Sequence, residues 1–163
     1  MCSDLDVGKN YFHLFSLVEY ALKANGYCKL NGDIVIGVDW FNFINDNPNI
    51  FEFASINDGI ISASIQFLLD APPKVQQMTT ANGNTFLRYV DMDLPTTTSN
   101  SHKISRYIRQ VRNNLFHGGK YRGEVFLDPA RSHDLIMHCT VLLQYLVEYD
   151  NDVAEAFRGC FSA

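Results

Sequence analysis

The segment from Leu135 to Tyr149 constrains the fold most, because as a helix it would be apolar on nearly every side. A helix of this kind has no face suited to water, so other elements must surround it. Asp128-Pro129 marks its start, with Asp as the N-cap and Pro at the first helical position. The sequence therefore predicts a central, buried helix. Its apolar residues include Ile136, Met137, Val141, Leu142, Leu143, Leu146 and Val147.

Three further segments before residue 71 have apolar residues at helical spacing. Val7 to Asn25 repeats them at intervals of three and four, which predicts a helix. Phe51 to Asp70 is a second helical candidate, with a break near Asp58-Gly59. Ile34 to Ile44 begins with β-branched residues that suit a strand, although its spacing and flanking turn signals favour a helix. In that helix the side chains of Val35, Val38, Trp40 and Phe41 would face inwards.

The connection from residue 71 to 101 has a different character. It opens with Pro72-Pro73 and contains the turn signal Asn82-Gly83. Within it, Phe86 to Val90 suits either a short strand or a helical turn. The segments before and after this connection do not look able to fold alone, so it is not a domain boundary. Near the end of the chain, Asp152 to Cys160 is predicted to form a short helix. We therefore predict one all-α domain over residues 1–163, a compact bundle of five to six helices.

Composition narrows the class of protein. The chain is 47% hydrophobic and 19% charged, a soluble globular profile, and no apolar stretch approaches the roughly 18 residues that span a bilayer. The amino-terminal segment does not resemble a signal peptide. Four cysteines lie far apart in the sequence and form no metal-binding pattern. We expect a cytoplasmic protein with free thiols, no membrane association and no metal or other cofactor. The cysteines are Cys2, Cys28, Cys139 and Cys160.

Charge is segregated along the chain. The net charge is −5, yet the window from Leu94 to Gly123 contains six basic residues and no acidic one. The negative net charge argues against a protein that binds nucleic acid over its whole surface. The basic window instead indicates a local anion site on an otherwise acidic protein. The alternative is a basic helix face that is merely solvated. No helix-turn-helix spacing is evident, which disfavours a sequence-specific DNA-binding protein.

The same window contains a predicted helix from His102 to Phe116. Ile104, Ile108, Val111 and Leu115 form a narrow apolar seam along it. At 100° per residue, the opposite face carries Arg106, Arg109, Asn113 and His117, and Arg112 lies at the flank of the seam beside Phe116. Gly118 is a natural residue to end the helix.

Arg112 and His117 suit the cleavage of RNA through attack by the 2′-hydroxyl. Arginine offers a fork of donors that matches phosphate oxygens, and histidine takes or gives a proton near neutral pH. Asn113 would orient either the imidazole or a phosphate oxygen. Because one chain places these groups in different directions, a two-fold pairing of this helix with its copy would complete the site.

The motif Arg112-x-x-x-x-His117, with Asn113 after the arginine and Gly118 after the histidine, resembles that of the HEPN superfamily. This resemblance implies a helical bundle, usually dimeric, with the motif helices at the interface. Many members are metal-independent ribonucleases of toxin–antitoxin, abortive-infection or RNA-processing systems. Carried over, Arg112 and His117 are catalytic and Asn113 is supporting. Gly119 stands where members silenced by a nucleotidyltransferase antitoxin have a tyrosine, which argues against that mode of control.

Two hypotheses follow for the function. The first is a homodimeric endoribonuclease, a toxin or a host- or phage-defence protein, with RNA as substrate and an antitoxin protein as a further partner. In it, the charge map assigns Arg106, Arg109 and Lys120 to the RNA backbone. The second is a catalytically inactive helical module that binds a protein or a nucleotide.

Overall fold

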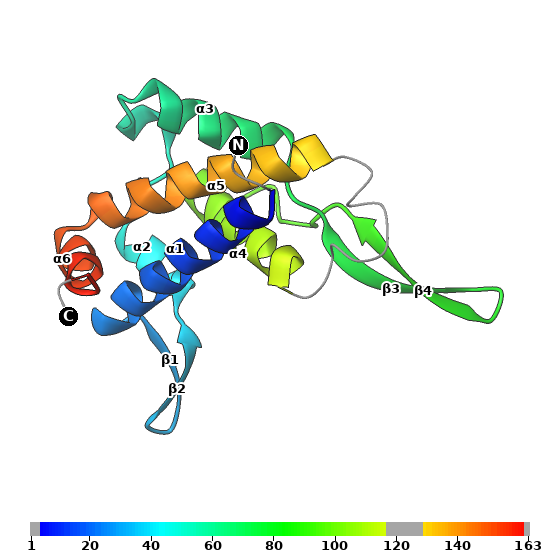
Figure 1. Ribbon diagram of the computed structural model, residues 1–163, viewed down its shortest axis with the longest axis horizontal. Coiled ribbons are helices and arrows are strands. Elements are labelled where there is room, and N and C mark those ends of the chain that lie inside the picture. Colours follow the sequence, from blue (N-terminus) through cyan, green and yellow to red (C-terminus); the bar gives the residue numbers. More distant parts are fainter. Residues whose placement is uncertain (1–3, 117–128, 162–163) are drawn as a thin grey trace.

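The structure is a computed structural model that describes residues 4–116 and 129–161 (Figure 1). Over these residues it contains six α-helices, one short 3-10 helix and two β-hairpins. The helices form the body, and both hairpins project from it. The bounds of the elements are α1 Asp4–Ala24, β1 Cys28–Asn31, β2 Ile34–Val38, α2 Trp40–Asp46, η1 Phe53–Ser55, α3 Gly59–Asp70, β3 Val75–Ala81, β4 Asn84–Val90, α4 Asn100–Phe116, α5 Pro129–Tyr149 and α6 Asn151–Gly159.

The prediction of an all-α bundle is wrong, because the two hairpins make the chain a mixed α/β protein. In the longer hairpin, β3 and β4 pair antiparallel from Val75 opposite Val90 to Ala81 opposite Asn84. The two residues between them are Asn82 and Gly83, both with positive φ, which is the backbone that a tight hairpin turn requires. The alternative of a strand at residues 86–90 is therefore the correct one.

The segment from Ile34 to Ile44 divides into two elements instead of forming one helix. Ile34–Val38 is strand β2, and Asp39 then caps α2 by accepting a hydrogen bond from the amide of Asn42 at 3.2 Å. Val38 and Trp40 are buried as predicted, but Val35 and Phe41 are 49% and 62% exposed. Side chains of a strand alternate between its two faces with a period of two. The prediction used the helical period instead, so it placed Val35 and Phe41 on the wrong side.

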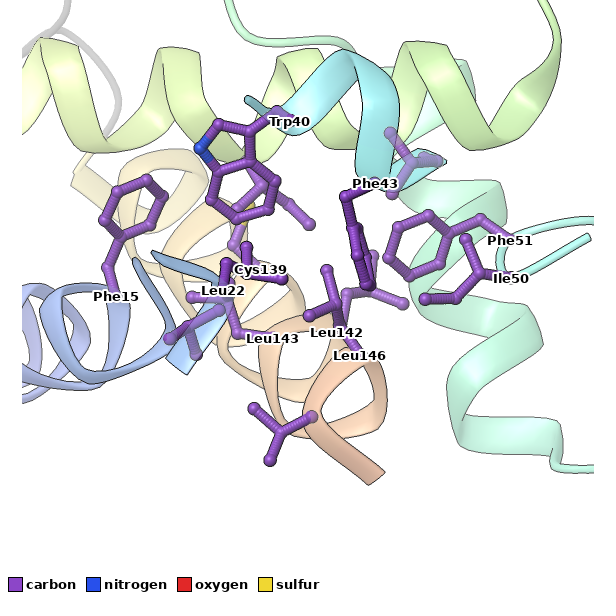
Figure 2. Close-up of a cluster of buried hydrophobic side chains, with 14 of the residues drawn as sticks. Phe15, Leu22, Trp40, Phe43, Ile50, Phe51, Cys139, Leu142, Leu143 and Leu146 are labelled. Carbon is purple, nitrogen blue, oxygen red and sulfur yellow. The ribbon is translucent and has the colours of Figure 1, made fainter. Parts of the chain in front are cut away.

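Helix α5 is the centre of the core, as predicted from its sequence, but it is not covered on every side, because Met137 is 46% exposed. It contacts α1, α3, α4 and α6, and its buried residues Cys139, Leu142, Leu143 and Leu146 meet aromatic side chains from other elements (Figure 2). Across the core, the hydroxyl of Tyr11 in α1 donates a 2.8 Å hydrogen bond to the carbonyl oxygen of Ile108 in α4. This contact joins the first helix to the basic one.

The remaining helical predictions agree with the structure. The predicted first helix lies in α1, the basic helix in α4 and the closing helix in α6. The stretch from Phe51 to Asp70 is interrupted as expected: η1 precedes α3, and the carboxylate of Asp58 accepts from the amides of Ile60 and Ile61 at the start of α3. The predicted cap Asp128 lies outside the described residues. Within those residues, no helix has the length and apolarity needed to cross a membrane.

Candidate functional site

Helix α4 is anchored by its apolar seam and by hydrogen bonds at its start. Ile104, Ile108 and Val111 are buried in the core, and Leu115 packs against it. At the amino end, the hydroxyl of Ser99 accepts from the amide of His102 at 3.3 Å, the capping contact expected of a serine there. This arrangement leaves Arg106 and Asn113 exposed on the opposite side of the helix, as the sequence predicted.

Arg112 is held by aromatic rings. Its guanidinium carbon lies 5.6 Å from the ring centre of Phe15, 6.0 Å from that of Phe12 and 5.2 Å from that of Phe116. Such contacts stabilise the cation through the negative faces of the rings. One terminal nitrogen donates a 3.1 Å hydrogen bond to Oδ1 of Asn113. The Nε atom of Arg112 is buried and has no hydrogen-bond partner in the described part of the chain.

Arg109 lies one turn earlier, over the ring of Trp40. Its guanidinium carbon is 6.0 Å from that ring, and its Nε donates to the carbonyl oxygen of Ser105 at 3.3 Å. Burial lowers the pKa of Arg109, the nearby charge of Arg106 lowers it further, and the carboxylate of Glu19 raises it. An arginine under these influences still carries its charge at neutral pH.

A pocket of about 440 Å³ opens beside these side chains. Arg106, Arg109, Arg112 and Asn113 form one wall of it. The rest of the lining comes from other elements and includes Phe15 and Glu19 of α1, Lys29 and Val38 of the first hairpin, Trp40 of α2, and Val75 and Met92 at the base of the second hairpin.

Trp40 is the aromatic residue of α2 that lines this pocket. The side chain is only 2% exposed, and Figure 2 shows it beside Phe15, whose ring centre is 5.7 Å away. Its indole Nε1 is buried without a hydrogen-bond partner among the described residues. Three guanidinium groups on one wall of the pocket favour an anionic ligand, and phosphate matches their geometry.

Four of the six predicted site residues therefore come together on this wall, namely Arg106, Arg109, Arg112 and Asn113. The other two, His117 and Lys120, lie outside the described residues. Sequence reasoning missed Glu19, Lys29 and Trp40, which reach the pocket from elements far away along the chain. Their sequence neighbours carry no motif, so no local pattern signals their role.

The histidines that the structure describes have other surroundings. A ring nitrogen of His102 lies 3.1 Å from Oδ1 of Asn45, and Nδ1 of His138 lies 3.0 Å from the hydroxyl of Ser64. No histidine of residues 4–116 and 129–161 lines the pocket. In the same residues, no three His, Cys, Asp or Glu side chains gather as a metal site.

Comparison with known protein families, with curated proteins and with solved structures finds no match to this chain. The chemistry of the pocket and the motif that begins in α4 are therefore what indicates a function. The resemblance to the HEPN superfamily stays a prediction.

Proposed function

We propose that this chain is a metal-independent endoribonuclease and that the α4 pocket binds the phosphate at which RNA is cut. The observation that supports this most directly is that Arg106, Arg109 and Arg112 meet on one wall of a pocket. The planar guanidinium group of arginine offers a fork of donors that matches phosphate oxygens. Three such cations would also stabilise the negative charge that builds up on the phosphate in the transition state.

The proposed reaction needs only proton transfers and this charge stabilisation. A base removes the proton of the 2′-hydroxyl, and the freed oxygen attacks phosphorus. The bond from phosphorus to the 5′-oxygen breaks, and an acid protonates that departing oxygen. The products are a 2′,3′-cyclic phosphate and a 5′-hydroxyl end. His117 follows directly after the last residue of α4, and we assign it to these proton transfers.

Asn113 has a supporting role in this scheme. Its Oδ1 accepts from Arg112, so it orients the guanidinium in addition to any contact with RNA. The reaction uses both a base and an acid, and the motif supplies one imidazole per chain. We therefore assign the second imidazole to a second copy of the chain, which makes the homodimer part of this proposal. A toxin or defence role, an antitoxin partner and a cytoplasmic location belong to it as well.

One observation favours a second candidate, a nucleotide-binding module without catalysis. The wall of arginines is complete without any described histidine. A pocket of this kind binds a phosphate whether or not a proton-transfer group is in place. Binding alone therefore does not separate the two candidates, whereas cleavage does.

The test is cleavage of an end-labelled single-stranded RNA in EDTA. Wild-type protein should cut it and leave 2′,3′-cyclic phosphate ends, and a single 2′-deoxy substitution should block its own site. Arg112→Gln and His117→Ala should each abolish cutting. Lys103→Ala removes a basic residue of the same helix that does not line the pocket, so this variant should cut like wild type.

Circular dichroism and thermal melting of each variant would establish that the fold is kept. Sedimentation of the wild type would test the dimer. Cleavage by well-folded Arg112→Gln and His117→Ala at the wild-type rate would refute the assignment of the site. If neither the wild type nor any variant cuts RNA but the wild type still binds nucleotides, the second candidate, a nucleotide-binding module, is favoured.

A further inference from the structure

Glu19 is out of place in a pocket that binds only phosphate. It lies on α1 and lines the pocket together with Arg106, Arg109 and Arg112. A carboxylate there repels the phosphate that the arginines attract. It is close enough to Arg109 to affect its pKa, yet within the described part of the chain its oxygens make no hydrogen bond or salt bridge. Two strong acceptors are thus open to a ligand that also carries N–H groups.

We propose that the pocket binds a guanine nucleotide of single-stranded RNA and that Glu19 recognises the base. This inference rests on the proposed function and specifies its substrate. In it, the two carboxylate oxygens of Glu19 accept from N1–H and the N2 amino group of guanine, while the arginines of α4 bind the phosphate. Glu19 is then a specificity-determining residue with no part in proton transfer.

Guanine matches this constellation better than the other bases. It is the one RNA base with two adjacent N–H groups on its Watson–Crick edge, and both oxygens of a carboxylate can therefore be used. Its O6 stands next to N1–H and accepts from a cation, a role open to Lys29 or Arg109 beside Glu19. Uracil offers one N–H, and adenine and cytosine each offer one amino group on this edge.

The size and lining of the pocket agree with a whole nucleotide. A volume of about 440 Å³ exceeds the needs of a phosphate alone and falls in the range of small-molecule sites. Val38, Val75 and Met92 supply apolar surface for the faces of a base. The Watson–Crick edge is open only in unpaired RNA, which makes the substrate single-stranded.

The simpler alternative is that Glu19 only balances the charge of Arg109. In that case its removal would change the affinity for every nucleotide by the same factor. Base recognition instead changes the ratio of affinities between nucleotides that differ at N1 and N2. This ratio of affinities distinguishes base recognition from charge balance, because an effect of charge changes both affinities by the same factor and leaves their ratio unchanged.

Mononucleotides provide the direct test on the full chain. Trp40 is the single tryptophan of the chain and lines the pocket, so its fluorescence should report binding. We expect guanosine monophosphate to bind at least about fivefold more tightly than inosine or uridine monophosphate, since inosine lacks only the N2 amino group. In Glu19→Gln the ratio of the guanosine to the inosine affinity should fall to about one, while the affinity for uridine monophosphate should rise as a negative charge is removed.

Cleavage ladders of RNA give an independent readout. Wild-type protein should cut next to unpaired guanines, and Glu19→Gln should cut with that preference lost. Equal affinities for all mononucleotides, or cuts without base preference, would overturn the guanine assignment but leave the proposed nuclease intact. If RNA is not cleaved and no mononucleotide binds, the proposed function fails together with this inference. A guanosine preference that Glu19→Gln retains would exclude Glu19 as its origin.

Discussion

The guanidinium carbon of Arg112 lies 5.6 Å from the ring centre of Phe15, a side chain that is 1% exposed. The cation of α4 is therefore fixed against the core by α1, and its position depends on the planar shape of arginine. Lysine has the same charge but neither the flat face nor the Nε donor.

We accordingly expect Arg112→Lys to lower RNA cleavage at least about tenfold. It should also reduce the free energy of unfolding by about 1 kcal/mol, because a lysine ammonium cannot stack on the rings as a planar guanidinium does. Cleavage rates and urea denaturation measure the two effects. Arg88→Lys, on exposed strand β4, is the matched control and should change neither quantity appreciably. Wild-type cleavage by Arg112→Lys would show that the site needs a charge there and no guanidinium.

The contact between Tyr11 and Ile108 predicts a specific loss of stability. Tyr11→Phe removes the buried hydroxyl that donates to the carbonyl oxygen of Ile108. We expect the free energy of unfolding to fall by about 1 kcal/mol, seen as a lower urea midpoint with an unchanged slope. Tyr20→Phe removes a hydroxyl from the same helix at a site that is 56% exposed, so it should be nearly neutral. Equal midpoints for both variants would contradict a stabilising role of this bond.

Alkaline pH should destabilise the fold through Cys139. Burial raises the pKa of its thiol in the folded state well above the value in the unfolded chain. Above about pH 8.5 the unfolded chain loses a proton that the folded chain keeps, so stability falls as pH rises. Tyr11, whose pKa is also raised by burial, adds to this fall above about pH 10.

Urea denaturation at pH 7, 8, 9 and 9.5 measures this effect. The free energy of unfolding should decrease with a slope that approaches about 1.4 kcal/mol per pH unit for one proton. Cys139→Ala should be less stable overall but should lose most of the slope. Cys160→Ala, at a half-buried position, is the comparison and should retain it. A wild-type stability that is flat up to pH 9.5 would exclude this linkage.

The longer helices were predictable from the sequence because their buried residues recur with a period near 3.6, as in α4. The hairpins were only partly predictable, since most of their apolar side chains are exposed and no alternation of polar and apolar residues marks a buried face. Ile34, Val35 and Ile36 in β2 are all exposed. A periodic sequence pattern arises where one face of an element is buried. The two hairpins project from the body and do not share a core, so they lack such a pattern.

The candidate site shows the same division. Arg106, Arg109, Arg112 and Asn113 share a helix, so their common location followed from the helical period. Glu19 and Trp40 reach the pocket through tertiary packing of α1 and α2 against α4. Long-range contacts of this kind have no signature within a short window of sequence.

Gly26 offers a test of the end of α1. Its φ of +85° is a left-handed conformation that side chains with a Cβ rarely adopt. We expect Gly26→Ala to lower the free energy of unfolding by about 1 kcal/mol, even though the added methyl group meets nothing within 4 Å. Gly59→Ala, in the first turn of α3 with equally open space, should be neutral or stabilising. The pair separates backbone strain from crowding, and a stable Gly26→Ala would argue against the left-handed end.

Arg106 allows RNA binding to be separated from folding, because its side chain is exposed while it lines the pocket. Arg106→Ala should weaken the binding of single-stranded RNA and leave the thermal midpoint unchanged. A lost phosphate contact should also lower the slope of log affinity against log salt concentration by about 0.7. Fluorescence titrations of an uncleavable 2′-deoxy analogue at several salt concentrations measure both quantities. Arg88→Ala removes an exposed arginine outside the pocket and should keep the wild-type slope; if both variants behave alike, the phosphate contact lies elsewhere.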